Sequence, residues 1–155
     1  MKNILVIGAG KTSSTLIKYL IENSETEQWN IIVVDRILSQ VIEKTQGHKN
    51  TEALEVDIMD EVQRRLLIKK ADLVISMLPA RFHLSTIIDC IALKTNIITP
   101  SYETPEIKEL DAEARKNGVL VMNELGLDPG IDHMSAMRIL NSIRRKGGEI
   151  RYFES

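Results

Sequence analysis

The sequence contains one cysteine, Cys90, and three histidines. A single cysteine excludes a disulfide within the chain and a zinc site built from several thiolates. The histidines are His48, His83 and His133, and their spacing fits no metal-binding motif, so we expect no metal site. Cysteine-poor chains are usual in reducing compartments, and we therefore expect a cytoplasmic location.

An excess of charge of one sign and a long apolar run are also missing. Lys and Arg together number 20 and Asp and Glu 22, which gives a net charge of −2. This balance argues against partners such as nucleic acid or an anionic membrane, which attract basic faces. No apolar run approaches the length that a transmembrane helix needs, and no signal-peptide pattern follows Lys2.

The composition is that of a folded domain. Hydrophobic residues make up 43% of the chain and charged residues 27%, which argues against disorder as the main state. A length of 155 residues corresponds to one domain with a sizeable core.

Short apolar, β-branched runs alternate with amphipathic stretches along the chain. The runs predicted as strands are residues 3–7, 31–34, 53–56, 73–76, 96–99 and 119–122. The stretches predicted as helices are 12–22, 38–44, 60–69, 81–93, 105–116 and 131–145. Near-continuous apolar strands separated by helices are typical of a parallel sheet that is covered on both faces. The predicted fold class is therefore α/β, a doubly wound Rossmann-type parallel sheet with three layers, α/β/α.

A glycine-rich segment joins the first predicted strand to the first helix. Its sequence, Gly8-Ala9-Gly10-Lys11-Thr12-Ser13, fits the dinucleotide fingerprint G-x-G-x-x-G with Ser13 in the third glycine position. Gly8 would allow a tight turn, and Gly10 would let a pyrophosphate approach the helix N-terminus. A P-loop would need a glycine where Leu5 stands, so that motif is excluded. A plain tight turn of an α/β protein is the alternative.

Residues at the ends of the next strands predict the rest of a nucleotide site. Asp35 ends the second strand, where a carboxylate binds the adenosine ribose hydroxyls and favours NAD over NADP. Arg36 follows it and offers a partner for a 2′-phosphate, so the expected cofactor is NAD or NADP, with NAD slightly favoured. Ligands of open sheets lie outside the carboxyl ends of the strands. Further cofactor contacts are therefore predicted at Asp57, Ile58, Ser76, Met77, Leu78 and Pro79.

The segment 122–133 is the most unusual part of the chain because it is dense in Gly, Pro and acidic residues. Asp128-Pro129-Gly130 is turn chemistry, so a simple strand-to-helix connection is one interpretation. The segment also follows the sixth predicted strand, beside Ser101 and Tyr102 after the fifth. We expect the two loops to meet near the nicotinamide end of the crevice.

With these segments the chain resembles the N-terminal cofactor domain of saccharopine dehydrogenases, in particular the glutamate-forming saccharopine reductases. The resemblance covers essentially the whole chain. The matching segments are Gly8-Ala9-Gly10, residues 72–79, Phe82-His83, residues 99–102 and residues 122–133.

The resemblance implies hydride transfer between NAD(P) and the secondary amine of saccharopine, a small amino-acid substrate of lysine metabolism. It implies nucleotide contacts at Gly8 to Ser13, Asp35, Asp57, Ile58 and Ser76 to Pro79. It implies substrate contacts at Ser101, Tyr102 and Asp128. The last two are candidate catalytic residues that would assist proton transfer. The family often has Gly where Ser13 stands, and its NADP-using members usually lack an acid where Asp35 stands.

The resemblance also divides the sequence. Residues 1–147 would form the NAD(P)-binding Rossmann domain, and residues 148–155 would start a strand that leads to a substrate domain outside this chain. We therefore expect residues 1–155 to be inactive alone, and the full-length enzyme to be a possible homodimer. Two alternatives are a stand-alone nucleotide-sensing regulatory domain and a carboxyspermidine-type dehydrogenase.

Overall fold

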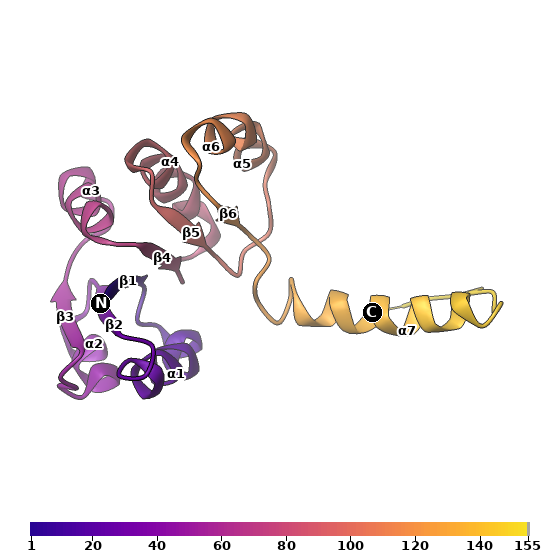
Figure 1. Ribbon diagram of the computed structural model, residues 1–155, viewed down its shortest axis with the longest axis horizontal. Coiled ribbons are helices and arrows are strands. Elements are labelled where there is room, and N and C mark those ends of the chain that lie inside the picture. Colours follow the sequence, from indigo (N-terminus) through magenta and orange to yellow (C-terminus); the bar gives the residue numbers. More distant parts are fainter. Residues whose placement is uncertain (155) are drawn as a thin grey trace.

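The computed structural model describes residues 1–154, which are built around a six-stranded parallel sheet (Figure 1). The strand order is β3-β2-β1-β4-β5-β6, and every neighbouring pair is parallel. The strands are β1 (Lys2–Ile7), β2 (Trp29–Asp35), β3 (Thr51–Glu55), β4 (Leu73–Ser76), β5 (Asn96–Ile98) and β6 (Val121–Met122). The order reverses between β1 and β4, and a crevice at the carboxyl ends of the strands is expected at such a point.

Helices cover both faces of the sheet, because crossovers of one hand that lead in opposite directions from the centre place them on opposite sides. One face packs against α1 (Ser14–Asn23) and α2 (Leu38–Thr45). The other packs against α3 (Glu61–Lys70), α4 (His83–Leu93), α5 (Pro105–Glu109) and α6 (Asp111–Asn117). The three-layer doubly wound fold that the alternating pattern predicted is confirmed.

The central strands supply side chains to both layers of the core. Successive residues of a strand point to opposite faces, so a strand between two helical layers must be apolar at every position. Leu5, Ile7, Ile32 and Val34 belong to the cluster under α3 and α4, and Ile4, Val6, Ile31 and Val33 to the cluster under α1 and α2.

Several predicted helices begin or break differently in the structure. Short 3-10 turns, Lys11–Ser13 and Ala80–Phe82, precede α1 and α4. The helix predicted over 105–116 is divided into α5 and α6 at Leu110. Asp60 caps α3 as its sequence position suggests, because its carboxylate accepts a hydrogen bond from the Gln63 N–H (3.1 Å).

The strand expected to start at residues 148–155 stays a prediction. Residues 149–154 form no strand, and Ser155 lies outside the described residues. A β-strand needs a partner strand to satisfy its backbone groups. This segment follows α7 (Ile131–Arg145), which extends away from the sheet and buries none of its residues (Figure 1).

Among residues 1–154, no helix has the combination of length and apolar character that crossing a bilayer demands.

Candidate functional site

A cavity of about 440 Å³ lies at the carboxyl ends of β1, β2, β3 and β4. This volume is in the range of small-molecule and cofactor sites. Its walls come from the glycine-rich turn, residues 8–13, and from the segments that follow the next three strands. The lining residues are Ile7, Gly8, Gly10, Thr12, Val34, Asp35, Arg36, Val56, Asp57, Ile58, Met59, Met77, Leu78, Pro79, Arg81 and Phe82.

The glycine-rich turn passes very close to the segment after β4. Gly8 has a φ of +104°, and a Cβ built on it would lie 2.9 Å from the carbonyl oxygen of Met77. At Gly10 an added Cβ would meet no atom within 4 Å, so space is open above the turn. The first N–H groups of a helix have no partner within it and can bind an anion in such a space. The turn therefore fits the pyrophosphate of a dinucleotide.

Asp35 holds the glycine-rich turn in place. Its Oδ2 accepts a hydrogen bond from the Ala9 N–H (2.7 Å), and its Oδ1 accepts one from the Ile37 N–H (3.1 Å). Both carboxylate oxygens thus have backbone donors before any ribose is bound. Arg36, by contrast, is exposed and lines the cavity.

Most of the predicted cofactor residues line this cavity, but four do not. Ala9, Ser13 and Ser76 are fully buried beneath its wall, and Lys11 is exposed beside it. Ser13 instead supports the turn, because its Oγ donates to the Gly10 carbonyl (2.8 Å).

Sequence reasoning did not assign Met59, Arg81 and Phe82 to the cofactor site. Arg81 follows the predicted segment Ser76–Pro79 by two positions, and its guanidinium lies 4.6 Å from the centre of the Phe82 ring. Phe82 was part of the family resemblance. Arg81 had no sequence signal, since only the path of the chain after β4 brings it to the cavity.

The two loops predicted to meet do so. The Glu124 N–H donates to the Ser101 carbonyl (2.9 Å), and the Tyr102 hydroxyl donates to Asp128 Oδ1 (2.6 Å). This hydrogen bond raises the pKa of Tyr102, so that the phenol stays protonated and continues to donate to the carboxylate. Neither Tyr102 nor Asp128 lines the 440 Å³ cavity.

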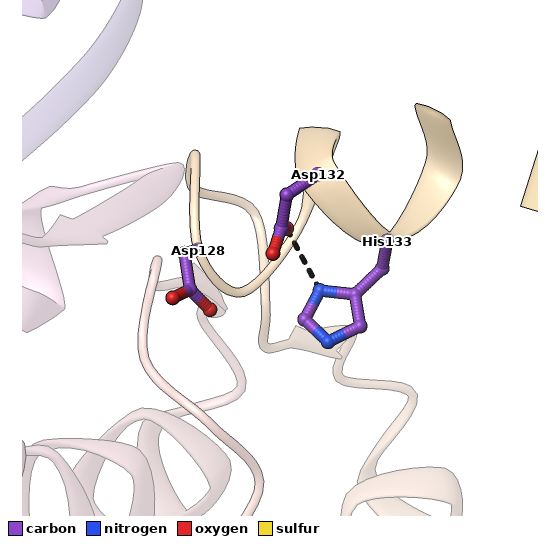
Figure 2. Close-up of side chains that lie close together, drawn as sticks. All are labelled: Asp128, Asp132 and His133. Atoms are coloured by element: carbon purple, nitrogen blue, oxygen red, sulfur yellow. Dashed lines mark hydrogen bonds and ion pairs between the residues drawn. The ribbon is translucent and has the colours of Figure 1, made fainter. Parts of the chain in front are cut away.

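Asp132 and His133, at the start of α7, lie beside Asp128 (Figure 2). His133 Nδ1 is 2.8 Å from Asp132 Oδ1, and the Tyr102 and His133 rings meet edge to face with centroids 6.4 Å apart. One ligand atom from each of Asp128, Asp132 and His133 falls within 4.8 Å of the others, a geometry that could hold a metal ion. All three side chains are exposed, and exposed acidic groups of this kind are common without one.

Gly130 shapes this loop. Its φ is +144°, and a Cβ there would collide with the backbone of Gly126. The Gly126 N–H donates to the Pro129 carbonyl (2.9 Å), so the backbone folds back on itself just before α7. This explains why Gly follows Asp128-Pro129 at this point.

His83 is buried between the cofactor segment and the Tyr102 loop. Its Nδ1 lies 2.9 Å from Ser76 Oγ, and its Nε2 lies 3.2 Å from Thr99 Oγ1, which also accepts from the Ser101 N–H. Burial lowers the pKa of His83, and a hydrogen bond to the Leu78 backbone partly offsets this effect. These contacts fit a structural role for His83.

Comparison with known proteins identifies relatives over the whole chain. The model of the family described as "Saccharopine dehydrogenase NADP binding domain" matches residues 4–122. The glutamate-forming, NADP(+) saccharopine dehydrogenase of Saccharomyces cerevisiae is 36% identical over 156 residues, covering 99% of this chain and 34% of that protein. The mitochondrial alpha-aminoadipic semialdehyde synthase of Bos taurus is also 36% identical, covering 99% of this chain and 16% of that protein.

A solved structure agrees with these matches. The apo form of the glutamate-forming saccharopine dehydrogenase from Saccharomyces cerevisiae superposes with a TM-score of 0.84 and 33% identity. The superposition covers 95% of this chain and 32% of the yeast chain. This chain therefore spans about a third of the length of its yeast relative. The matches favour neither the regulatory-domain alternative nor the carboxyspermidine-type alternative, and they confirm the resemblance.

Proposed function

We propose, from the premise that this chain belongs to the saccharopine dehydrogenase NADP-binding domain family, that it binds NADP(H) for an enzyme that oxidises the secondary amine of saccharopine. The observation that carries the proposal is the cavity at the sheet's carboxyl edge. A turn with room for a pyrophosphate and Arg36 both lie in its wall.

The proposal of NADP rather than NAD rests on the different contacts of Asp35 and Arg36. The expected preference for NAD finds no support, because the family model is described as NADP binding and the yeast relative is named for NADP(+). Both carboxylate oxygens of Asp35 already accept hydrogen bonds from backbone N–H groups. This weakens the argument that they select ribose hydroxyls. Arg36 is exposed in the cavity wall and offers a donor for a 2′-phosphate.

The reaction would combine chemistry from the cofactor with positioning by this chain. A bound nicotinamide supplies the acceptor for a hydride, and the protein supplies orientation and electrostatics. Asp128 can accept a hydrogen bond from a protonated secondary amine, and such a charge-assisted bond is worth about 1.5–3 kcal/mol. Tyr102 fixes the orientation of Asp128 through its hydroxyl. Substrate contacts at Ser101, Tyr102 and Asp128 remain part of the proposal.

An assay of the complete protein with saccharopine tests this function. Formation of the reduced nicotinamide should be much faster with NADP+ than with NAD+ and should depend on saccharopine. Tight nucleotide binding without saccharopine-dependent turnover would support a regulatory domain instead. Turnover with a carboxyspermidine and none with saccharopine would favour the related dehydrogenase.

A further inference from the structure

A buried ion pair connects α3 to α4. Arg64 Nε lies 2.7 Å from Asp89 Oδ2, and their side chains are only 7% and 5% exposed. Arg65, which is partly exposed, places its Nη1 2.5 Å from the other oxygen of Asp89. Both carboxylate oxygens of Asp89 are therefore paired, as a charge in a buried site requires.

Stability alone is a weak reason for such a pair. Removing two charges from water costs free energy that their attraction only partly returns, and replacing both with apolar residues is often neutral or stabilising. The contact that distinguishes Arg64 lies elsewhere. Its Nη1 donates to the carbonyl of Ile58 at 2.9 Å, in the loop between β3 and α3.

This loop forms one wall of the dinucleotide cavity. Val56 and Ile58 are almost fully buried and line the cavity together with Asp57 and Met59. The loop is tightened locally by Asp57, whose Oδ1 accepts from the Met59 N–H (3.0 Å). Arg64 joins this turn to the buried interface of α3 and α4, because one guanidinium bonds both Ile58 and Asp89.

We propose that Arg64, held by Asp89, is a positioning residue for the adenosine end of the dinucleotide site. It fixes the Ile58 carbonyl and so the wall that Asp57 and Ile58 present to the adenine. If the loop is already rigid in the free protein, ligand binding does not have to pay the entropy of ordering it. The affinity for the ligand is then higher. The inference rests on the proposed function, since it requires a dinucleotide in this cavity.

The double variant Arg64→Met/Asp89→Leu separates positioning from stability. It replaces the ion pair with apolar side chains, so the thermal midpoint should stay near that of the wild type or rise. Binding to this chain would be measured by titration with adenosine 2′,5′-bisphosphate and, by NMR, with nicotinamide mononucleotide. We expect affinity for the adenosine ligand to fall about tenfold and affinity for the nicotinamide ligand to stay unchanged.

Two single variants complete the test. Arg65→Met is the matched control, because it removes a cation from Asp89 without touching Ile58, and it should bind the adenosine ligand within about twofold of the wild type. Arg64→Lys keeps a cation near Asp89 but lacks the planar fork that bonds two partners, so it should lose affinity like the double variant. If the double variant does not fold, Arg64→Lys decides the question.

The outcomes distinguish a failure of the positioning role of Arg64 from a failure of the proposed function. Wild-type affinity for adenosine 2′,5′-bisphosphate in a folded double variant, or in Arg64→Lys, would overturn the positioning role alone. An equal loss for both ligands would also overturn it, since a general loosening of the fold would explain that result. A wild-type chain that binds neither ligand would contradict the proposed function itself.

Discussion

The neighbours of Asp35 in the structure give this side chain a different role from the one that its sequence position predicts. A carboxylate at the end of the second strand is expected to bind ribose, yet here it accepts the N–H groups of Ala9 and Ile37. The residue type and its position were predictable from the sequence. The backbone donors were not, because the distance from β2 to the glycine-rich turn is set by the sheet. The same holds for Arg81, which reaches the cavity only through the path of the chain after β4.

Asp35→Ala should weaken binding of NADP+ and NAD+ alike, by about tenfold or more. The substitution leaves the Ala9 N–H without its acceptor, and a hydrogen bond to a charged group contributes about 1.5–3 kcal/mol. Titration calorimetry with both nucleotides measures the effect. Glu55→Ala is the control. Glu55 lies on β3 opposite Asp35 of β2, but it is exposed and lines no part of the cavity. A loss of NAD+ affinity alone would restore Asp35 to the role of ribose selector.

Asp128→Asn in the complete enzyme should lower kcat with saccharopine by about tenfold or more, since it removes the charge while keeping the shape. Tyr102→Phe should lower kcat less, because it removes only the hydroxyl that orients Asp128. Nucleotide affinity should stay unchanged in both variants, as neither residue lines the cavity. Unchanged turnover per folded molecule in Asp128→Asn would reduce Asp128 to a turn residue.

His83 predicts a pH dependence of stability. Its pKa is lowered in the folded state, so the unfolded chain binds the extra proton as the pH falls below about 6.5. The free energy of unfolding should therefore fall from pH 7 to pH 5, by at most about 1.4 kcal/mol per pH unit for one group. Denaturant titrations should show a flatter pH profile for His83→Gln.

Cys90→Ala is the control for this profile. Cys90 is fully buried in the same helix, α4, and burial raises the pKa of its thiol to about 12, outside the range tested. The variant should be less stable at every pH and keep the wild-type slope. An unchanged slope in His83→Gln would show that other groups cause the pH dependence.

At the scale of elements, hydrophobic periodicity predicted every strand of the sheet and the bounds of α7. Central strands are recognisable because both faces are buried and each position is apolar, as in β1 and β2. The break at Leu110 and the 3-10 turn before α4 were not predicted, because apolar spacing alone does not record how a helix begins or divides. Residues 149–154 form no strand here, and the strand expected to start there stays a prediction, because a β-prone sequence forms a strand only where a partner edge exists.

The contact between the glycine-rich turn and the segment after β4 gives a prediction at this scale. Gly8→Ala should abolish detectable binding of NADP+, because its Cβ would approach the Met77 carbonyl oxygen to 2.9 Å in a backbone conformation that disfavours side chains. Fluorescence titration with NADPH measures this. Gly47→Ala is the control: Gly47 also has a positive φ but no atom within 4 Å of its added Cβ, and it lies outside the cavity. Binding by a folded Gly8→Ala variant would refute the tight approach.

For the whole molecule, the alternation of apolar and amphipathic segments predicted the fold, and the resemblance of five segments predicted the family. The sequence did not predict that α7 extends away from the sheet with none of its residues buried. The exposed Asp128 and His133 lie at the start of α7 (Figure 2), and the Tyr102 hydroxyl donates to Asp128. The chain spans about a third of the length of its yeast relative.

We propose that the cavity at the carboxyl edge of the sheet binds NADP through a phosphate-binding turn and Arg36. Calorimetric titration of this chain with NADP+ and NAD+, repeated with Arg36→Ser, tests this proposal directly. We expect the wild type to bind NADP+ at least about tenfold more tightly than NAD+, and Arg36→Ser to remove this difference while leaving NAD+ affinity unchanged. Equal or tighter binding of NAD+ by the wild type, or no binding of either nucleotide, would contradict it.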